Sequence, residues 1–132
     1  MRISALAFWV SAILVQPVFA ADCRDQTQSG LNDCAQVAFQ KADRALNEVY
    51  KEITGRLSDD ADTTKLLTQA QRAWISFRDA ECAFAAASVN GGSIYPMIHS
   101  ICLETQTRKR TSELRGFLNC EEGSLDCPVP LP

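Results

Sequence analysis

Six cysteines are the residues with the most reactive chemistry in this 132-residue sequence. Cysteine side chains can bind zinc, act as nucleophiles or pair as disulfides. The sequence has no Cys-x-x-Cys pair, and its single histidine, His99, has no second histidine to share a zinc ion with. An even number of cysteines in a small exported chain instead favours three disulfides, with no metal or other cofactor. These residues are Cys23, Cys34, Cys82, Cys102, Cys120 and Cys127.

Acid–base catalysis has few candidates among the other side chains. His99 is the only imidazole and falls inside an expected helix, where a lone histidine is usually a boundary residue. The acidic pairs Asp59-Asp60 and Glu121-Glu122 fall in an expected loop and in the tail. A general acid needs burial to raise its pKa, and both pairs are expected to be solvated. The sequence therefore predicts a protein that is not an enzyme.

The first 20 residues have the pattern of a cleavable signal peptide. Arg2 precedes an apolar run over residues 5–15, Pro17 breaks that run, and cleavage is expected after Ala20. The run is too short to span a bilayer well. Asp22 before Cys23 does not fit a lipid-attachment site, which needs a small residue there. We expect a mature protein free of the membrane, with a helical domain over 21–119 and a disulfide-closed, proline-rich tail over 120–132.

The charge of the mature chain limits its partners. Cleavage removes only Arg2 among the charged residues, so the formal charge changes from -3 to about -4. An acidic protein is a poor ligand for nucleic acid or anionic membranes. The charge mildly favours a basic protein partner.

Apolar residues at steps of three and four predict helices over about 32–57, 63–87 and 93–117. Asn32 or Asp33 and Asp62 or Thr63 are the expected N-caps of the first two, and Pro96 fits the first turn of the third. The residues at these steps are expected to be buried. They are Ala35, Ala38, Phe39, Ala42, Leu46, Val49, Tyr50, Ile53 and Leu57; then Leu67, Ala70, Trp74, Phe77 and Phe84, flanked by Ile75 and Ala80; then Ile94, Ile98, Ile101, Thr105, Leu114 and Leu118.

Short connections between these helices favour an all-α, three-helix up-down-up bundle held by disulfides. In that arrangement Cys120 lies at one end with only Cys127 nearby, which predicts this pair. The other four cysteines gather at the opposite end and allow three pairings. We prefer Cys23–Cys34 with Cys82–Cys102.

One segment of the second helix is dense in polar and aromatic side chains. Gln71, Trp74 and Arg78 follow one another at steps of three and four and share a face with Cys82, while Asp79 follows Arg78. An arginine on a core-facing stripe must find acceptors. We expect Trp74 to anchor the core, and Arg78 and Gln71 to bond the first helix. The expected partners there are Asp43, Asn47 or Tyr50.

These residues together form a pattern that resembles the LprI-type lysozyme inhibitors. The pattern comprises Leu31-Asn32-Asp33-Cys34, Ala42-Asp43, Leu46-Asn47, Tyr50, Gln71, Trp74, Arg78-Asp79, Cys82, Gly91-Gly92-Ser93, Cys102-Leu103, Thr107, Arg110 and Leu114. The resemblance implies an exported helical domain, in a bacterial periplasm or secreted, that restrains lysozyme. The segment from Cys120 to Cys127 is an addition to the pattern.

The leading hypothesis is therefore a protein that binds and occludes a lysozyme-type muramidase. The loop Asn90-Gly91-Gly92-Ser93 is the candidate for entering the cleft. The competing interpretation of this loop is a simple helix connection whose glycines serve the turn. The alternative function is a periplasmic adaptor or immunity-type protein that binds another basic envelope protein, again without catalysis.

Overall fold

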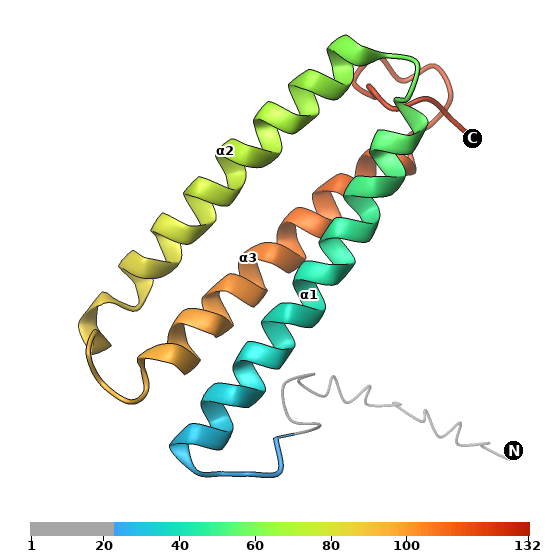
Figure 1. Cartoon of the computed structure of the whole chain (residues 1–132). Coiled ribbons are helices and arrows are strands. Elements are labelled where there is room, and N and C mark those ends of the chain that lie inside the picture. Colours follow the sequence, from blue (N-terminus) through green and yellow to red (C-terminus); the bar gives the residue numbers. More distant parts are fainter. Residues whose placement is uncertain (1–22) are drawn as a thin grey trace, which may run out of the picture.

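The computed structural model describes residues 23–132, which form three long helices and one short one (Figure 1). They are α1 (Gln28–Arg56), α2 (Ala61–Ala85), the 3-10 helix η2 (Ala87–Val89) and α3 (Tyr95–Leu118), with no strand in this range. The predicted all-α, up-down-up bundle is confirmed. None of these helices is long and apolar enough to cross a membrane. The predicted signal peptide lies outside the described residues.

Side chains cap the first two helices, but not the ones that the sequence predicted. The Thr27 hydroxyl accepts a hydrogen bond from the Gly30 N–H, and the Asp60 carboxylate accepts one from the Thr63 N–H. Both helices therefore begin a few residues earlier than expected, because the residues before Asn32 and Thr63 also take helical conformations. Pro96 lies in the first turn of α3, as predicted.

The apolar core lies between α1, α3 and the tail. Residues of these three segments form one buried cluster: Leu46, Val49, Ile53, Leu57, Leu114 and Val129. Polar contacts fix α1 and α3 side by side at both ends, through Asn32 to the Ser93 carbonyl and Arg56 to the Leu118 carbonyl. The tail covers the core near Leu57 and Leu114 with Val129, which is 5% exposed. The division of the chain into a helical domain over 21–119 and a separate tail over 120–132 stays a prediction.

The face that α2 buries differs from the predicted one. Gln71, Arg78 and Cys82 are buried, whereas Phe77 and Phe84 are 56% and 78% exposed. The physical reason is that Cys82 is cross-linked to α3 and Arg78 bonds both neighbouring helices, which fixes how α2 is rotated. Three other residues predicted to be buried or flanking on this helix are also exposed: Ala70, Ile75 and Ala80.

A similar correction applies to α3. Ile101 and Thr105 are exposed, and the face that packs on α1 is largely polar. Its buried residues are Ser100, Leu103, Glu104, Thr107, Thr111 and Leu114. The hydroxyl groups bond within the bundle, as when Ser100 donates to the Gln36 amide oxygen at 3.0 Å. Satisfied polar groups can therefore take core positions that an apolar pattern does not mark.

All three preferred disulfides are present. Cys23–Cys34 and Cys82–Cys102 lie at the end of the bundle that holds the connection between α2 and α3, with Cα separations of 5.7 and 5.5 Å. Cys120–Cys127 closes the tail with a Cα separation of 6.0 Å. The prediction of pairing by bundle end is confirmed.

The cap of α2 gives a pH prediction. The hydrogen bond from the Thr63 backbone N–H holds the pKa of Asp60 below its ordinary value of 3.8. A carboxyl whose pKa is lower in the folded state stabilises the fold above the unfolded-state pKa and loses this effect as pH falls through the folded-state pKa. Urea unfolding between pH 6 and pH 2 is therefore expected to show a smaller loss of stability in Asp60→Asn than in the parent. The amide still caps the helix but does not titrate. Identical pH profiles would contradict this role.

Candidate functional site

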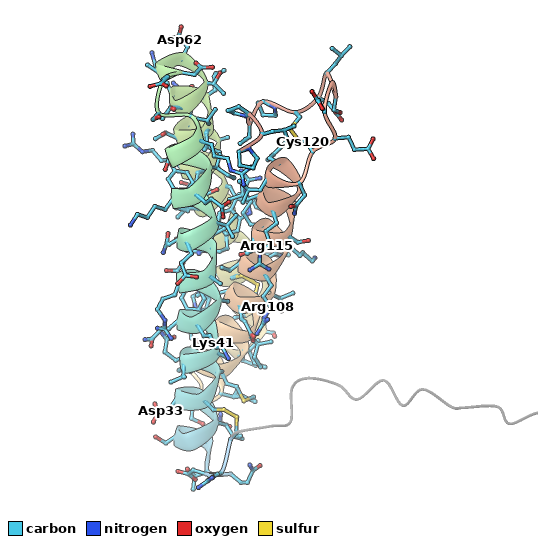
Figure 2. The ribbon with its side chains drawn as sticks, turned by 90° about the vertical axis from the view of Figure 1, so that its right-hand side faces the viewer. Asp33, Lys41, Asp62, Arg108, Arg115 and Cys120 are labelled. Carbon is cyan, nitrogen blue, oxygen red and sulfur yellow. A yellow bond between two sulfur atoms is a disulfide. The ribbon has the colours of Figure 1, made fainter. Side chains whose placement is uncertain are left out.

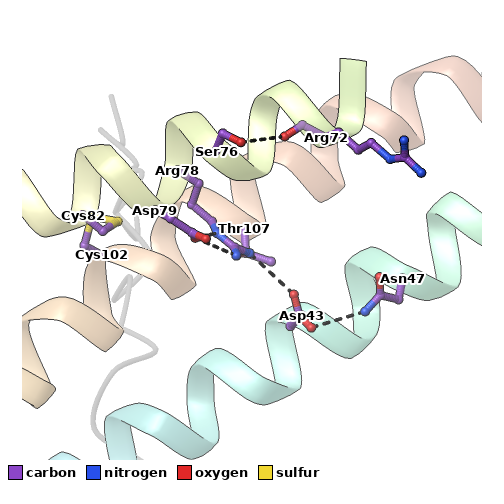
Figure 3. Close-up of polar contacts among 9 residues, drawn as sticks. All are labelled: Asp43, Asn47, Arg72, Ser76, Arg78, Asp79, Cys82, Cys102 and Thr107. Carbon is purple, nitrogen blue, oxygen red and sulfur yellow. Dashed lines mark hydrogen bonds and ion pairs between the residues drawn. A yellow bond between two sulfur atoms is a disulfide. The ribbon is translucent and has the colours of Figure 1, made fainter. Parts of the chain in front are cut away.

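Arg78 is the centre of a polar cluster that joins all three long helices (Figure 3). Its Nη2 lies 2.8 Å from Oδ1 of Asp79, and its Nη1 donates to the Thr107 hydroxyl at 3.3 Å. Nη1 also lies 3.6 Å from Oδ1 of Asp43 on α1. The residue is 8% exposed, so these contacts supply the acceptors that a buried guanidinium requires. Of the three partners expected on the first helix, Arg78 meets Asp43, through an ion pair at 3.6 Å and not through a hydrogen bond.

Two aromatic rings also contact the Arg78 guanidinium. Its central carbon lies 5.2 Å from the centroid of a Trp74 ring and 5.4 Å from that of Phe39. Cation–π contacts at these distances are favourable, and more so away from water. Arg78 therefore holds α2 to α1 through Phe39 as well as through Asp43. These side-chain contacts are needed to hold α2 to α1, because the backbone of α1 packs mainly on α3.

The remaining motif residues extend this cluster along the bundle. Gln71 accepts a hydrogen bond from Nε of Arg110 on α3 at 3.0 Å, so the prediction that it bonds the first helix is wrong. The Tyr50 hydroxyl lies 3.1 Å from that of Thr68, and Asn47 donates to Asp43 at 3.3 Å. The sequence pattern contained Arg110 but gave it no partner. These contacts position the helices relative to one another.

No group of three His, Cys, Asp or Glu residues within 23–132 could hold a metal ion, and no cysteine there is free. The ring of His99 stacks on that of Tyr95, with centroids 5.4 Å apart. A hollow of about 550 Å³ lies where α1 meets α2, and Thr54, Ser58, Thr64, Lys65 and Arg72 are among its lining residues. It contains no carboxylate pair.

The loop between η2 and α3 is an ordered turn. Gly91 has a φ of +78°, a conformation that favours glycine, and a Cβ at Gly92 would lie 3.1 Å from the Val89 carbonyl oxygen. Asn32 of α1 donates to the Ser93 carbonyl at 2.9 Å. Asn90 is exposed, and the Cys82–Cys102 disulfide joins the two helices that flank the loop. The predicted use of glycines for turn geometry is confirmed, and the loop is held in one shape.

Carboxylates outnumber basic groups around this loop, where the neighbouring basic residues are Arg24, Arg78 and Arg108. Residues 25–40 and 79–107 contain five carboxylates and no lysine or arginine. The disulfides and the Asn32–Ser93 bond place both segments at one end of the bundle, which we call the loop end. Asp33 lies at this end, while Lys41, Arg108 and Arg115 lie further along the bundle and Cys120 near its other end (Figure 2). The loop end is therefore one acidic part of the surface, and the opposite end, with Asp59, Asp60, Glu121 and Glu122, is another.

A comparison with protein-family models identifies the family of this chain. The family model described as lysozyme inhibitor LprI matches residues 20–114, ending before the Cys120–Cys127 tail. An uncharacterized protein of Rhizobium meliloti is 38% identical over 113 residues, which cover 76% of this chain and 81% of that protein. The uncharacterized protein YecT of Escherichia coli is 29% identical over 105 residues, which cover 70% of this chain and 65% of YecT.

A solved structure shows the same fold. A DUF1311 family protein from Pseudomonas putida superposes with a TM-score of 0.62 at 25% sequence identity. The match covers 71% of this chain and 93% of that one.

Proposed function

Because the chain belongs to the LprI lysozyme inhibitor family, we propose that its exported, mature form binds a lysozyme-type muramidase and blocks its cleft without any catalysis of its own. The observation that carries this proposal is the family match, which spans nearly all of the helical domain. The proposed location is the bacterial periplasm or the exterior, reached through the signal peptide predicted over residues 1–20.

The loop end is the surface that we assign to the partner. A muramidase cleaves glycosidic bonds with a pair of carboxyl groups in a cleft, and a protein inhibitor needs only to keep substrate out of it. Many lysozymes are basic, and an acidic surface attracts a basic partner and speeds encounter. The carboxylates of Asp33 on α1 and Glu81 on α2 contribute that charge near the loop 90–93.

The rigidity of the loop favours this role. Gly91 allows the positive φ of the turn, the Asn32 side chain holds the Ser93 carbonyl, and the Cys82–Cys102 disulfide joins the flanking helices. A segment that is already ordered loses less conformational entropy when it enters a cleft. The loop therefore needs no refolding to act as the inserted element.

The test of the proposal is a lysis assay. Purified mature protein is mixed with a basic lysozyme, and the clearing of a bacterial cell-wall suspension is followed by turbidity. We expect slower clearing as the inhibitor is added, with a plateau near equimolar amounts if binding is tight. Unchanged clearing at a hundredfold molar excess would contradict the proposal for that lysozyme.

Charge reversal at the loop end is expected to weaken inhibition. In Asp33→Lys combined with Glu81→Lys, four units of charge change beside the loop, and we expect the association rate to fall about tenfold at low salt. The matched control is Glu121→Lys with Glu122→Lys, which makes the same change in net charge at the opposite end of the bundle. Stopped-flow or surface-binding kinetics would measure both. Equal effects of the two variants would show that net charge alone is responsible and that the loop end is not the binding surface.

The second hypothesis, an adaptor or immunity-type protein for another basic envelope protein, would use the same acidic surface. Crosslinking of the mature protein in envelope extracts separates the two. A stable complex with a protein unrelated to lysozyme, together with no effect in the lysis assay, would favour this hypothesis.

A further inference from the structure

A small hollow between α1 and α3 is lined by three basic side chains and by no carboxylate. Its volume is about 220 Å³, and the lining residues that matter here are Lys41, Ala42 and Ala45 of α1 with Arg108, Ser112 and Arg115 of α3. The two alanines leave room for the hollow, because their side chains end at Cβ. We call this feature the α1–α3 hollow.

The basic side chains of the hollow are arranged in a row. Lys41 lies on α1, and Arg108 and Arg115 lie on α3, further along the bundle than the loop end (Figure 2). Arg108, Ser112 and Arg115 follow one another at steps of four and three, so they share one line of α3. Arg108 and Arg115 are two turns apart, which is about 10 Å along the helix. The positive charge is therefore spread along the hollow.

A buried carboxylate orients Arg108. Its Nε donates to Oε1 of Glu104, one turn earlier on α3, at 2.8 Å. The Glu104 side chain is 7% exposed, whereas that of Arg108 is 60% exposed. One carboxylate occupies at most two of the five N–H groups of a guanidinium. Glu104 therefore holds Arg108 in place and leaves N–H groups on its outer side for a ligand.

The nearby carboxylates do not cancel the positive charge of the hollow. Asp43 and Glu113 each pair with an arginine outside the hollow. Glu48, two turns from Lys41 on the same line of α1, forms no ion pair with another residue of 23–132. Three positive charges therefore meet at most two negative ones, those of Glu104 and Glu48. An excess of positive charge remains here, in a chain whose formal net charge is -3.

We propose that the α1–α3 hollow binds a diphosphate group, or two phosphate groups held close together on one molecule. Guanidinium, ammonium and hydroxyl groups are the donors that bind phosphate oxygens, and arginine binds them in pairs. A single phosphate reaches the donors at one end of the row, whereas a diphosphate extends from Lys41 and Arg108 toward Arg115. The site does not depend on the proposed binding of lysozyme.

Titration of the isotope-labelled mature protein with sodium pyrophosphate, followed by NMR of the backbone amides, tests the proposal. With the ionic strength held at about 100 mM, we expect saturable shifts in residues 41–45 and 108–115. The expected Kd is about 1 mM, because salt screens exposed cations. Orthophosphate should bind about fivefold more weakly, because it reaches fewer of the donors.

Removal of two of the three charges should weaken binding. We expect Lys41→Gln combined with Arg115→Gln to raise the Kd for pyrophosphate about tenfold. Both residues are exposed, so the variant should fold, which far-UV circular dichroism would check. Arg108 is kept, since its loss would leave the buried Glu104 carboxylate without its partner.

The matched control is Lys65→Gln combined with Arg72→Gln. It makes the same change in net charge at two exposed residues of α2 that line a different hollow, and it should bind pyrophosphate like the parent. No saturable shift up to about 10 mM pyrophosphate, or equal weakening in both double variants, would overturn the site. Orthophosphate that binds as tightly as pyrophosphate would overturn the two-phosphate ligand.

Vesicles separate a soluble ligand from a lipid headgroup. The probe is phosphatidylcholine vesicles with about 20% cardiolipin, whose headgroup carries two phosphates, and the measurement is cosedimentation of the mature protein. We expect none, because the net negative charge of the chain opposes approach to a whole anionic surface. Cosedimentation that Lys41→Gln combined with Arg115→Gln abolishes would assign the hollow to a lipid headgroup and overturn the soluble ligand.

Discussion

Removing the Cys82–Cys102 disulfide is expected to lower the free energy of unfolding by about 3 kcal/mol. The bond closes a 20-residue segment, and a cross-link of that length removes about this much chain entropy from the unfolded state. Cys82 is fully buried, so the variant with both cysteines changed to alanine avoids placing a hydroxyl in the core. Urea unfolding followed by circular dichroism measures the change.

The tail disulfide provides the control for this prediction. Changing Cys120 and Cys127 to alanine opens a segment with a sequence separation of 7, for which the same model gives a loss of about 2 kcal/mol. The two variants should also differ in function, because only Cys82–Cys102 flanks the loop 90–93. A loss below about 1 kcal/mol for the first variant would show that the loop end is held by its other contacts.

Replacing Arg78 with leucine is expected to cost about 2–3 kcal/mol of unfolding free energy. The substitution removes the bond to the buried Thr107 hydroxyl, worth about 1–2 kcal/mol, and the contacts with the Trp74 and Phe39 rings, worth about 1 kcal/mol. Asp43 and Asp79 are half exposed, so water can solvate them after the change. Their charges therefore add little to the loss.

Arg78→Lys separates the contribution of charge from that of shape. Lysine keeps the positive charge but lacks the planar guanidinium that bonds Asp79 and Thr107 while it contacts the Trp74 and Phe39 rings. We expect it to recover less than half of the loss caused by leucine. A lysine variant as stable as the parent would show that charge alone secures α2, contrary to the geometry around the guanidinium.

The sequence predicts the helices and the disulfides well because both depend on local information. Steps of three and four in α1 mark Leu46, Val49 and Ile53, which all lie in the core. The up-down-up order then leaves Cys120 with Cys127 as its only neighbour in reach. Helix starts were less accurate, because Thr27 and Asp60 cap earlier turns that an apolar pattern does not mark.

The rotation of α2 could not be predicted from its apolar residues. Phe77 and Phe84 suggested one buried face, yet Gln71, Arg78 and Cys82 define another. A covalent bond and a guanidinium with three partners outweigh the burial of two aromatic rings. Of the candidate site residues, the structure joins Asp43, Asn47, Trp74, Arg78 and Asp79 in one cluster. It joins Gln71 to Arg110 and Tyr50 to Thr68 separately.

The motif and the proposed binding surface therefore have different roles. The cluster around Arg78 positions α2, and with it one side of the loop end. The residues proposed to meet a partner are the exposed ones at that end, including Asn90 and the carboxylate of Asp33. Sequence patterns single out the first group more readily, because buried contacts restrict residue type at fixed spacings.

A binding titration of the mature protein against a basic lysozyme tests the central claim most directly. Isothermal calorimetry at about 20 mM and 300 mM salt would measure affinity and stoichiometry together. We expect one lysozyme per chain, with affinity that falls as salt rises, because the acidic loop end contributes to attraction. Absence of binding at low salt with both proteins at about 100 µM, or binding that Asp33→Lys combined with Glu81→Lys leaves unchanged, would contradict the account.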